Sequence, residues 1–416
     1  MSSCSNLSRA DYENAQVYYE ELLRDGVHWY NSFHVYVYQV LCLAGVLANI
    51  CIIIVLLKPN MRKNIFNLFL IAVAICDMTL MASYLLYKLV ELCHPWYFTY
   101  AWIVFTYFYA VFSVFVHSLS LWLTVNMAVL RFLVLRNASS NSSLNLNSQA
   151  AAWFFIGIAF VISLVGSTPN MLRYEIQDRG DIPSPPECVR NESSLAESVR
   201  LYSIGQPPFW NCSWERFSFW TAGIILKLVP CILLTIFMTL LVRMLIEARE
   251  RRSRLVGSAA ALRRGSIQQG NAKSQAERTT AMLTIIVAVF LITELPQGIL
   301  VVAIGVQPTA QLAMRYLGNL LDLLSLLNSS VNFILYSTMS NVFRQEFLDT
   351  FGACSRLIKT GSTQLSDARN ANGSLKIKLL RTPSGRLQNA TTTTPLTGPR
   401  KLLIEENMPN GEYKEL

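Results

Sequence analysis

Several charged side chains and an imidazole lie within stretches that are otherwise largely apolar. A charged side chain at the centre of a bilayer costs about 2.5–3.5 kcal/mol on insertion scales, so each one needs a partner or a function. Carboxylates in such surroundings can hold a cation, pair with a buried amine or line an ion path. The residues concerned are Asp77, His117, Arg131, Lys227, Glu294 and Asp322.

Glu294 and Lys227 are candidates for an internal ion pair. A carboxylate buried among apolar residues needs a cation nearby, because an uncompensated buried charge is strongly destabilising. Lys227 lies one helical turn before Pro230 on a neighbouring apolar stretch, which makes it the candidate partner. Glu294 therefore either pairs with Lys227 or contacts a ligand directly, and the sequence leaves both interpretations open.

Polar residues recur at helical spacing in two of the apolar stretches, which places each set on one face of a helix. The sets are His117, Ser120, Thr124 and Arg131, and Asp322, Ser325, Ser329, Asn332 and Tyr336. A membrane-spanning helix turns such a face toward protein or water and away from lipid. These helices must therefore pack together around a hydrogen-bonded interior.

The composition is that of a membrane protein. Apolar residues make up 52% of the chain and charged residues only 15%, against about 25% in soluble domains. A bilayer crossing needs about 20 apolar residues, and seven stretches reach that length: about 34–57, 65–89, 101–135, 150–172, 218–246, 278–305 and 314–337. We expect an all-α, seven-helix transmembrane bundle over residues 34–337.

The distribution of charge predicts the orientation in the membrane. The segment 247–278 is rich in arginine and lysine, so the positive-inside rule makes it cytoplasmic. Seven crossings then put residues 1–33 outside the cell and the C-terminus inside. The excess of basic residues lies in connecting segments, which is explained better by orientation in a membrane than by binding to nucleic acid.

The third apolar stretch carries a resemblance to a known family. Its residues 118–132, Ser-Leu-Ser-Leu-Trp-Leu-Thr-Val-Asn-Met-Ala-Val-Leu-Arg-Phe, resemble the third helix of a rhodopsin-like G-protein-coupled receptor, with Arg131 as the arginine of its Asp-Arg-Tyr motif. The sequence is most similar to invertebrate receptors for myosuppressin and related FMRFamide-like peptides. Further family positions follow in order on their own spans: Asn49, Asp77, Trp153, Pro230, Pro296, Asn332 and Tyr336.

The chain departs from the family pattern at several positions. Leu130 and Phe132 replace the acid and the tyrosine beside Arg131, and Phe333 replaces the proline of the Asn-Pro-x-x-Tyr motif. Glu294 stands where the family has a tryptophan two residues before Pro296. We expect the seventh helix to be locally straight, because proline removes a backbone hydrogen bond and kinks a helix.

The resemblance implies signalling through heterotrimeric G proteins and no enzymatic reaction. Agonist binding shifts the population toward a state in which the sixth helix moves outward. The residues it assigns to this change are Arg131, Pro230, Phe290, Pro296, Asn332 and Tyr336. It also implies arrestin, receptor kinases and membrane lipid as partners, and inhibitory G-protein coupling is common in the group.

The resemblance also implies an allosteric Na⁺ site and no other cofactor. In this family an aspartate on the second helix holds sodium together with hydroxyl and amide groups. The residues that would form this polar network are Asp77, Asn49, Ser120, Asn328, Ser329 and Asn332. The alternative is that Asp77 is protonated, or is hydrogen-bonded only to Asn49 and Asn332.

The expected ligand is an extracellular peptide that ends in Arg-Phe-NH₂. Its guanidinium can take a carboxylate bidentately, and its ring needs an aromatic wall. Two carboxylates, Asp322 and Glu294, are available for the guanidinium. The other ligand-binding candidates are Tyr109, Phe112, His117, Lys227 and Gln297; for His117 the alternative is a buried imidazole bonded only within the protein.

Other classes remain as alternatives. Another peptide or a small ligand is the nearest, although an amine receptor would normally carry an aspartate where this chain has Ser113 and Val114. Intramembrane charges also occur in transporters and channels, but these would show internal repeats and Gly-rich broken helices. A metal enzyme would need ligand spacing that the four histidines lack.

Several modifications follow from the expected topology. Disulfide candidates are Cys93, Cys188 and Cys212, paired either as Cys93 with one of the other two or as Cys188 with Cys212. Asn6, Asn191 and Asn211 begin glycosylation sequons on the outer side. Residues 338–352 predict a short amphipathic eighth helix, followed by Cys354 as a palmitoylation candidate. Residues 353–416 predict a disordered cytoplasmic tail.

Overall fold

The computed structural model describes residues 9–90, 94, 96–139, 146–183, 198–257 and 266–352. Cys93, Cys188, Cys354, Asn6 and Asn191, together with the predicted tail 353–416, lie outside these residues. Within the described part, seven helices are long and apolar enough to cross a membrane. The predicted all-α transmembrane bundle is therefore confirmed.

The spanning helices follow the apolar stretches closely, because the length of an apolar run is a local property of the sequence. They are α2 (His34–Leu56), α4 (Ile65–Leu89), α5 (Tyr100–Ser139), α6 (Gln149–Met171), the continuous run of α7 (Cys212–Trp220), η3 (Thr221–Leu228) and α8 (Val229–Gly257), then α9 (Ser266–Val306) and α10 (Gln311–Met339). The short α3 (Pro59–Arg62) and η4 (Pro308–Ala310) are connections, and residues 341–352 are also helical.

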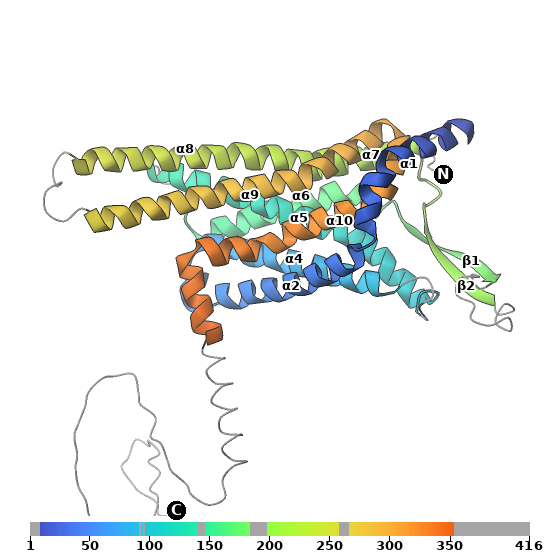
Figure 1. Ribbon diagram of the computed structural model, residues 1–416, viewed down its shortest axis with the longest axis horizontal. Coiled ribbons are helices and arrows are strands. Elements are labelled where there is room, and N and C mark those ends of the chain that lie inside the picture. Colours follow the sequence, from blue (N-terminus) through green and yellow to red (C-terminus); the bar gives the residue numbers. More distant parts are fainter. Residues whose placement is uncertain are drawn as a thin grey trace, which may run out of the picture. The chain divides into compact units, whose positions relative to one another are not determined.

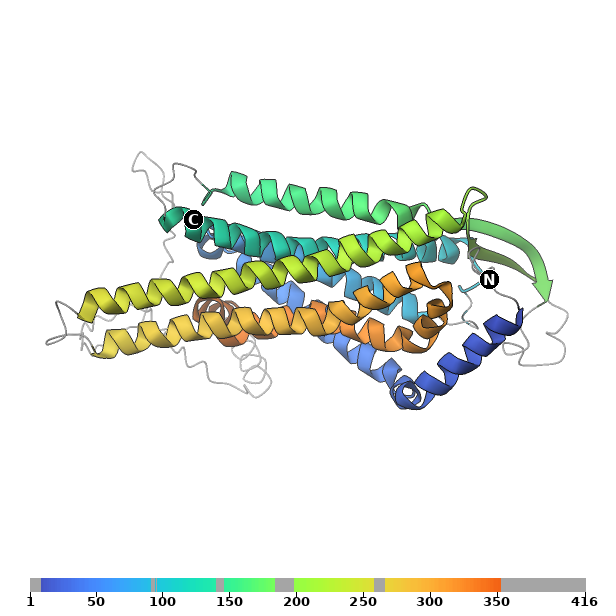
Figure 2. The ribbon, with the colours of Figure 1, turned by 90° about the horizontal axis from the view of Figure 1, so that it is seen from above.

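The helices lie side by side around a shared apolar core. Figures 1 and 2 show α8 and α9 running along one another, with α5 and α6 adjacent. Side-chain caps define some of the helix starts: Asn64 accepts a hydrogen bond from Phe66 N, and Ser148 accepts one from Ala151 N. Large apolar side chains remain exposed on the outer faces, which is the arrangement expected of a bundle surrounded by lipid.

One end of the bundle carries structure that the sequence did not predict. The N-terminal segment forms the helix α1 (Arg9–Asn31), which packs against α10. The long connection after α6 contains an antiparallel hairpin of β1 (Glu175–Pro183) and β2 (Ser198–Gly205). Figure 1 shows α1 and the hairpin at the same end, which we call the hairpin end.

The helix that carries Lys227 contains an irregular segment. Residues Thr221–Leu228 form the π-helix η3, which ends just before Pro230. Gly298 on α9 lets the two segments approach closely, since a Cβ added there would lie 3.1 Å from Lys227 Cβ. Pro296 lies inside α9, and α10 continues without interruption through Phe333.

Candidate functional site

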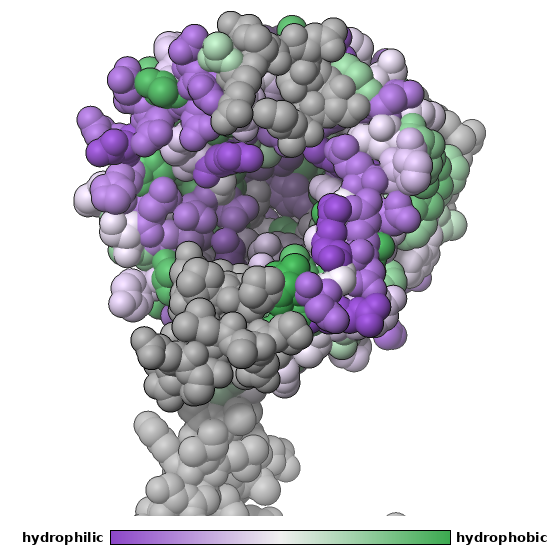
Figure 3. Space-filling view, turned by 90° about the vertical axis from the view of Figure 1, so that its right-hand side faces the viewer, coloured by the Kyte–Doolittle hydropathy of each residue, from purple (hydrophilic) through white to green (hydrophobic). Residues whose placement is uncertain are grey.

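The bundle contains a cavity of about 240 Å³ whose walls come from α4, α5, η3, α9 and α10. Its polar lining includes Tyr84, Tyr109, His117, Lys227, Gln297 and Asp322. Figure 3 views the bundle from the hairpin end, where the surface is hollowed and hydrophilic residues surround the opening. Five of the predicted ligand-binding residues therefore line one cavity, although they are far apart in the sequence.

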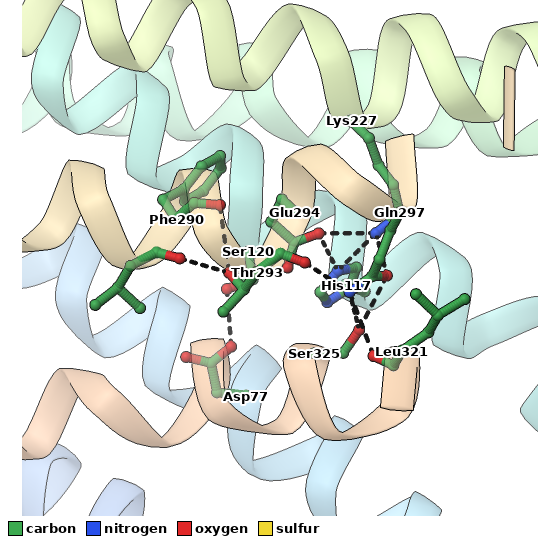
Figure 4. A network of polar contacts seen from close by, with 11 residues as sticks. Asp77, His117, Ser120, Lys227, Phe290, Thr293, Glu294, Gln297, Leu321 and Ser325 are labelled. Carbon is green, nitrogen blue, oxygen red and sulfur yellow. Dashed lines mark hydrogen bonds and ion pairs between the residues drawn. The ribbon is translucent and has the colours of Figure 1, made fainter. Parts of the chain in front are cut away.

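Glu294 lies within the bundle as the centre of a charged cluster (Figure 4). Lys227 Nζ donates to Glu294 Oε2 at 2.7 Å, so the ion pair predicted as one alternative is present. His117 Nε2 lies 3.0 Å from the same oxygen and donates to it, while Lys227 Nζ also donates to Gln297 Oε1 at 3.0 Å. The cluster joins α5, η3 and α9 through a carboxylate that is completely buried.

Gln297 extends this cluster toward α10. Its Nε2 donates to the Thr293 and Leu321 carbonyl oxygens at 2.9 and 3.3 Å. Nε2 also donates to Ser325 Oγ at 3.1 Å, and Ser325 Oγ donates to Gln297 Oε1 at 3.2 Å. Because the charges of Lys227 and Glu294 cancel, the network behaves as a neutral polar contact between helices. Glu294 Oε1 and His117 Nδ1 are buried without hydrogen-bond partners, so the cluster retains unused capacity to accept hydrogen bonds.

Asp322 is in a different electrostatic situation. Tyr84 OH donates to its Oδ2 at 2.9 Å, and Asp322 makes no ion pair in the part of the chain that the structure describes. Lys88 lies nearby, with Nζ 5.4 Å from the centre of the Tyr84 ring, but it does not reach the carboxylate. Asp322 thus places a carboxyl group on the cavity wall that pairs with no cation among the described residues.

Tyr84 itself belongs to a chain of polar contacts that sequence reasoning missed. His34 Nε2 lies 3.2 Å from Tyr84 OH, and Tyr30 OH lies 2.8 Å from His34 Nδ1. Tyr84 lies seven residues after Asp77, two helical turns along the same face, and this spacing was the available signal. Tyr30 and His34 gave no such signal, because His34 meets Tyr84 through the packing of α2 on α4 and Tyr30, at the end of α1, meets His34.

Asp77 lies in a separate polar network. Ser120 Oγ donates to its Oδ1 at 2.8 Å and Asn332 Nδ2 donates to its Oδ2 at 3.0 Å. Asn49 does not contact Asp77, since its Nδ2 donates to the carbonyl oxygens of Gly45 and Ser329. Oxygen atoms of Asn49 and Ser329 are nevertheless buried there without partners. A small hard cation suits such oxygen donors, and the Na⁺ site stays a prediction.

Two predicted residues lie outside these networks. Phe112 is 48% exposed and packs on Phe115, and it does not line the cavity. The residues of α5 that line the cavity include Tyr109, Ser113 and His117, which are spaced four apart on one face of the helix. Phe112 lies on a different face, so the expectation that it forms part of the cavity wall is wrong. Asn328 makes no side-chain hydrogen bond within the described residues.

The end of the bundle away from the hairpin contains Arg131. Its guanidinium carbon lies 5.1 Å from the centre of the Phe66 ring, and no carboxylate in the described ranges pairs with it. Leu130 is fully buried, as expected of an apolar residue in place of the family's acid. Tyr336 and Phe290 are also buried.

The start of α7 combines two predicted modification sites. Asn211 caps the helix by accepting a hydrogen bond from Trp214 N at 3.1 Å, and its side chain is exposed. Cys212 is disulfide-bonded, and its partner lies outside the described residues. The bond identifies Cys212 as one end of a pair, while the choice between Cys93 and Cys188 stays open. Glycosylation of Asn211 remains a prediction.

Comparison with known proteins gives consistent matches. The profile of a family described as "Serpentine type 7TM GPCR chemoreceptor Srw" matches residues 36–354. G-protein coupled receptor dmsr-1 of Caenorhabditis elegans is 32% identical over 391 residues, which cover 85% of this chain and 75% of that protein. Sex peptide receptor-related protein 2 of C. elegans is 26% identical over 62% of this chain and 57% of its own. The sex peptide receptor of Drosophila melanogaster is 24% identical over 80% and 75%.

The buried charge cluster makes a first prediction. Lys227→Met leaves Glu294 uncompensated in the interior and should lower the free energy of unfolding by about 3–5 kcal/mol. The double variant Lys227→Met/Glu294→Gln removes both charges and should recover most of that loss. Thermal unfolding of the purified protein and its cell-surface level measure both effects.

Lys58→Met is the matched control for this experiment. Lys58 pairs with Glu346 at 3.3 Å, but both side chains are partly exposed, so the change should cost no more than about 1 kcal/mol. Equal losses for Lys58→Met and Lys227→Met, or no recovery in the double variant, would contradict the role given to the cluster.

Proposed function

The chain belongs to the Srw family of serpentine seven-transmembrane G-protein-coupled receptors, and from this membership we propose that its ligand is an extracellular, C-terminally amidated neuropeptide of the FMRFamide-like or myosuppressin-like class. Receptors of this family convert no substrate, so the protein is not an enzyme. The presence of sex peptide receptors among its relatives supports a peptide ligand.

The observation that carries the proposal is that Asp322 lines the cavity without a paired cation among the described residues. Glu294, the other carboxylate considered for the ligand, is fully buried and already paired with Lys227 at 2.7 Å. Within the described residues, the Asp322 carboxylate accepts one side-chain hydrogen bond, from the Tyr84 hydroxyl to Oδ2, so Oδ1 is left to receive a cation. A guanidinium is a suitable cation because it is planar, always charged and able to bind a carboxylate with two hydrogen bonds. We therefore place the arginine of the peptide at Asp322.

The aromatic residues near Asp322 suit the neighbouring phenylalanine of such a peptide. Tyr109 lines the cavity and stacks on Tyr87 with ring centres 4.6 Å apart, and Phe105 continues this stack along α5. Offset or edge contacts between aromatic rings contribute about 0.5–1.5 kcal/mol beyond burial of their area. The terminal amide, which carries no charge, can use the unpaired acceptors of the cluster around Glu294.

The proposed mechanism is a shift between two arrangements of α9. In the described state, α9 is joined to η3 and α5 through Glu294, Lys227 and His117. A ligand that competes for these groups favours the state in which α9 moves away from its neighbours, and the energy available is its difference in affinity for the two states. The family places Arg131 and Tyr336 in the cytoplasmic cleft that this motion opens for a G protein.

The proposal includes an orientation and a set of partners. The hairpin end faces the outside of the plasma membrane, and the end that carries Arg131 faces the cytoplasm. The G protein is of the inhibitory class, and arrestin and receptor kinases act on the tail 353–416, while Cys354 anchors the end of the eighth helix to lipid. The polar network around Asp77 holds Na⁺ in the resting state.

A peptide panel tests the proposed ligand class. Cells that express the chain with a promiscuous G protein should respond to peptides ending in Arg-Phe-NH₂, and the same peptides with a free C-terminal acid should be inactive. The acid adds a negative charge to the ligand near Asp322, and the Asp322 carboxylate should repel it. If no peptide elicits a response at confirmed surface expression, this ligand class is wrong, while membership of the receptor family stands.

The role of Asp322 predicts a loss of agonist potency. Asp322→Asn keeps an acceptor for Tyr84 but removes the charge, and loss of a charge-assisted hydrogen bond of about 1.5–3 kcal/mol corresponds to roughly a 10- to 150-fold loss of potency. Asp322→Ala should cost at least as much. Leu324→Ala, on the same helix, should change potency by far less. Concentration–response curves at matched surface expression measure these effects, and similar losses for all three variants would speak against a cation at Asp322.

The missing acid beside Arg131 predicts basal signalling. Arg131 has no carboxylate partner within the described residues, so nothing of opposite charge restrains it in the resting state. Leu130→Asp should lower agonist-independent output, whereas Leu130→Asn has nearly the same shape without the charge and should not. The comparison is made in a second-messenger assay normalised to surface level; equal output from the two variants would contradict the explanation.

A further inference from the structure

Three hydrogen bonds form a continuous chain from α1 to the cavity wall, and all of them run in one donor-to-acceptor direction. The hydrogen-bond chain links Tyr30, His34, Tyr84 and Asp322. Tyr84 OH donates its proton to Asp322 Oδ2 at 2.9 Å. Since a hydroxyl has one proton, Tyr84 can only accept from His34 Nε2 at 3.2 Å. A neutral imidazole protonated at Nε2 has an acceptor at Nδ1, and Tyr30 OH lies 2.8 Å from it and donates. Each proton in the chain therefore points toward the carboxylate.

The side chains that form this hydrogen-bond chain are shielded from water. Tyr30, His34 and Tyr84 are 7%, 3% and 5% exposed. Burial, and after it the charge of Asp322, raises the pKa of Tyr30 to about 12, so this hydroxyl keeps its proton throughout the physiological range. Hydrogen bonds in series polarise one another more strongly in a low-dielectric environment than in water. The end of the N-terminal helix α1 is thereby connected to a residue of the cavity wall.

We propose that Tyr30 and His34 are positioning residues of the ligand site: through Tyr84 they hold Asp322 by Oδ2, which leaves Oδ1 directed to the cation of the ligand. This inference rests on the proposed function of Asp322. It makes α1, which lies outside the seven spans, a component of the site and not only a covering element.

The hydrogen-bond chain determines which ring nitrogen of His34 carries the proton. When Tyr30 donates to Nδ1, the imidazole proton lies on Nε2 and Tyr84 is free to donate to Asp322. When Tyr30 loses its hydroxyl, the proton can move to Nδ1, and Nε2 then accepts the proton of Tyr84. Tyr30→Phe should in this way withdraw a hydrogen bond from Asp322, although Tyr30 does not touch it.

The first experiment needs no ligand. The chain has four histidines, so the His34 signals in nitrogen-15 spectra of histidine-labelled receptor in lipid nanodiscs can be assigned by comparison with His34→Gln. Wild-type receptor should show His34 protonated at Nε2, and Tyr30→Phe should shift the proton toward Nδ1. Tyr18→Phe is the matched control, because it makes the same chemical change on α1 at a residue that is 61% exposed. An unchanged His34 tautomer in Tyr30→Phe would overturn the proposal.

The second experiment uses an Arg-Phe-NH₂ peptide that activates the receptor. Tyr30→Phe should reduce its potency about threefold to tenfold, the effect of one neutral hydrogen bond. In a Tyr84→Phe background the hydrogen-bond chain is already interrupted, so adding Tyr30→Phe should cause no further loss of agonist potency. His34→Gln, which can still donate to Tyr84, should retain more potency than His34→Leu.

The two experiments separate the possible failures. Independent, additive potency losses for Tyr30→Phe and Tyr84→Phe would show that Tyr30 contributes to stability alone and would overturn the proposal. If no amidated peptide elicits a response, the proposed ligand class is wrong, and the nitrogen-15 spectra would then test the hydrogen-bond chain by itself. Surface expression of each variant excludes a failure to fold as the cause of a potency loss.

Discussion

The ion pair between Lys227 and Glu294 is the interaction on which the rest of the interior depends. Glu294 has no exposed surface, and Lys227 supplies its cation where η3 packs against α9, at a position where Gly298 lacks the side chain that would obstruct the approach. His117 and Gln297 then complete the coordination from α5 and α9. The pair thus determines both the spacing of three helices and the polarity of the cavity floor.

The three acidic residues of the interior differ in the partners that their carboxyl groups have. Asp77 is held by neutral donors on α5 and α10, and Glu294 is matched by a lysine. Among the described residues, Asp322 accepts a side-chain hydrogen bond from Tyr84 and makes no ion pair, and it lines the cavity. Three acids in similar helical surroundings therefore differ in what they can still bind. The contact proposed between Asp322 and a basic ligand group follows from this difference.

The sequence predicted the features that depend on local pattern. The seven spans and the polar face of the seventh follow from run length and helical period, and the pairing of Lys227 with Glu294 follows from the cost of buried charge. Phe112 was misplaced because a helix has to be rotated correctly about its axis before its inward residues are known. The hairpin, α1 and the contacts that link Tyr30 to His34 and His34 to Tyr84 could not be predicted, since they depend on which segments meet in space.

The π-helix η3 has a consequence for how sequences of this kind are compared. A π-helical turn accommodates one residue more than an α-helical turn, and each residue in a helix rotates the following side chains by about 100°. Deleting one residue within Thr221–Leu228 would restore a regular helix and turn position 227 away from α9. Relatives without this extra residue must therefore be aligned with a gap inside an otherwise continuous helix. An ungapped alignment would assign the lysine to the wrong column and hide its pairing with the acid of α9.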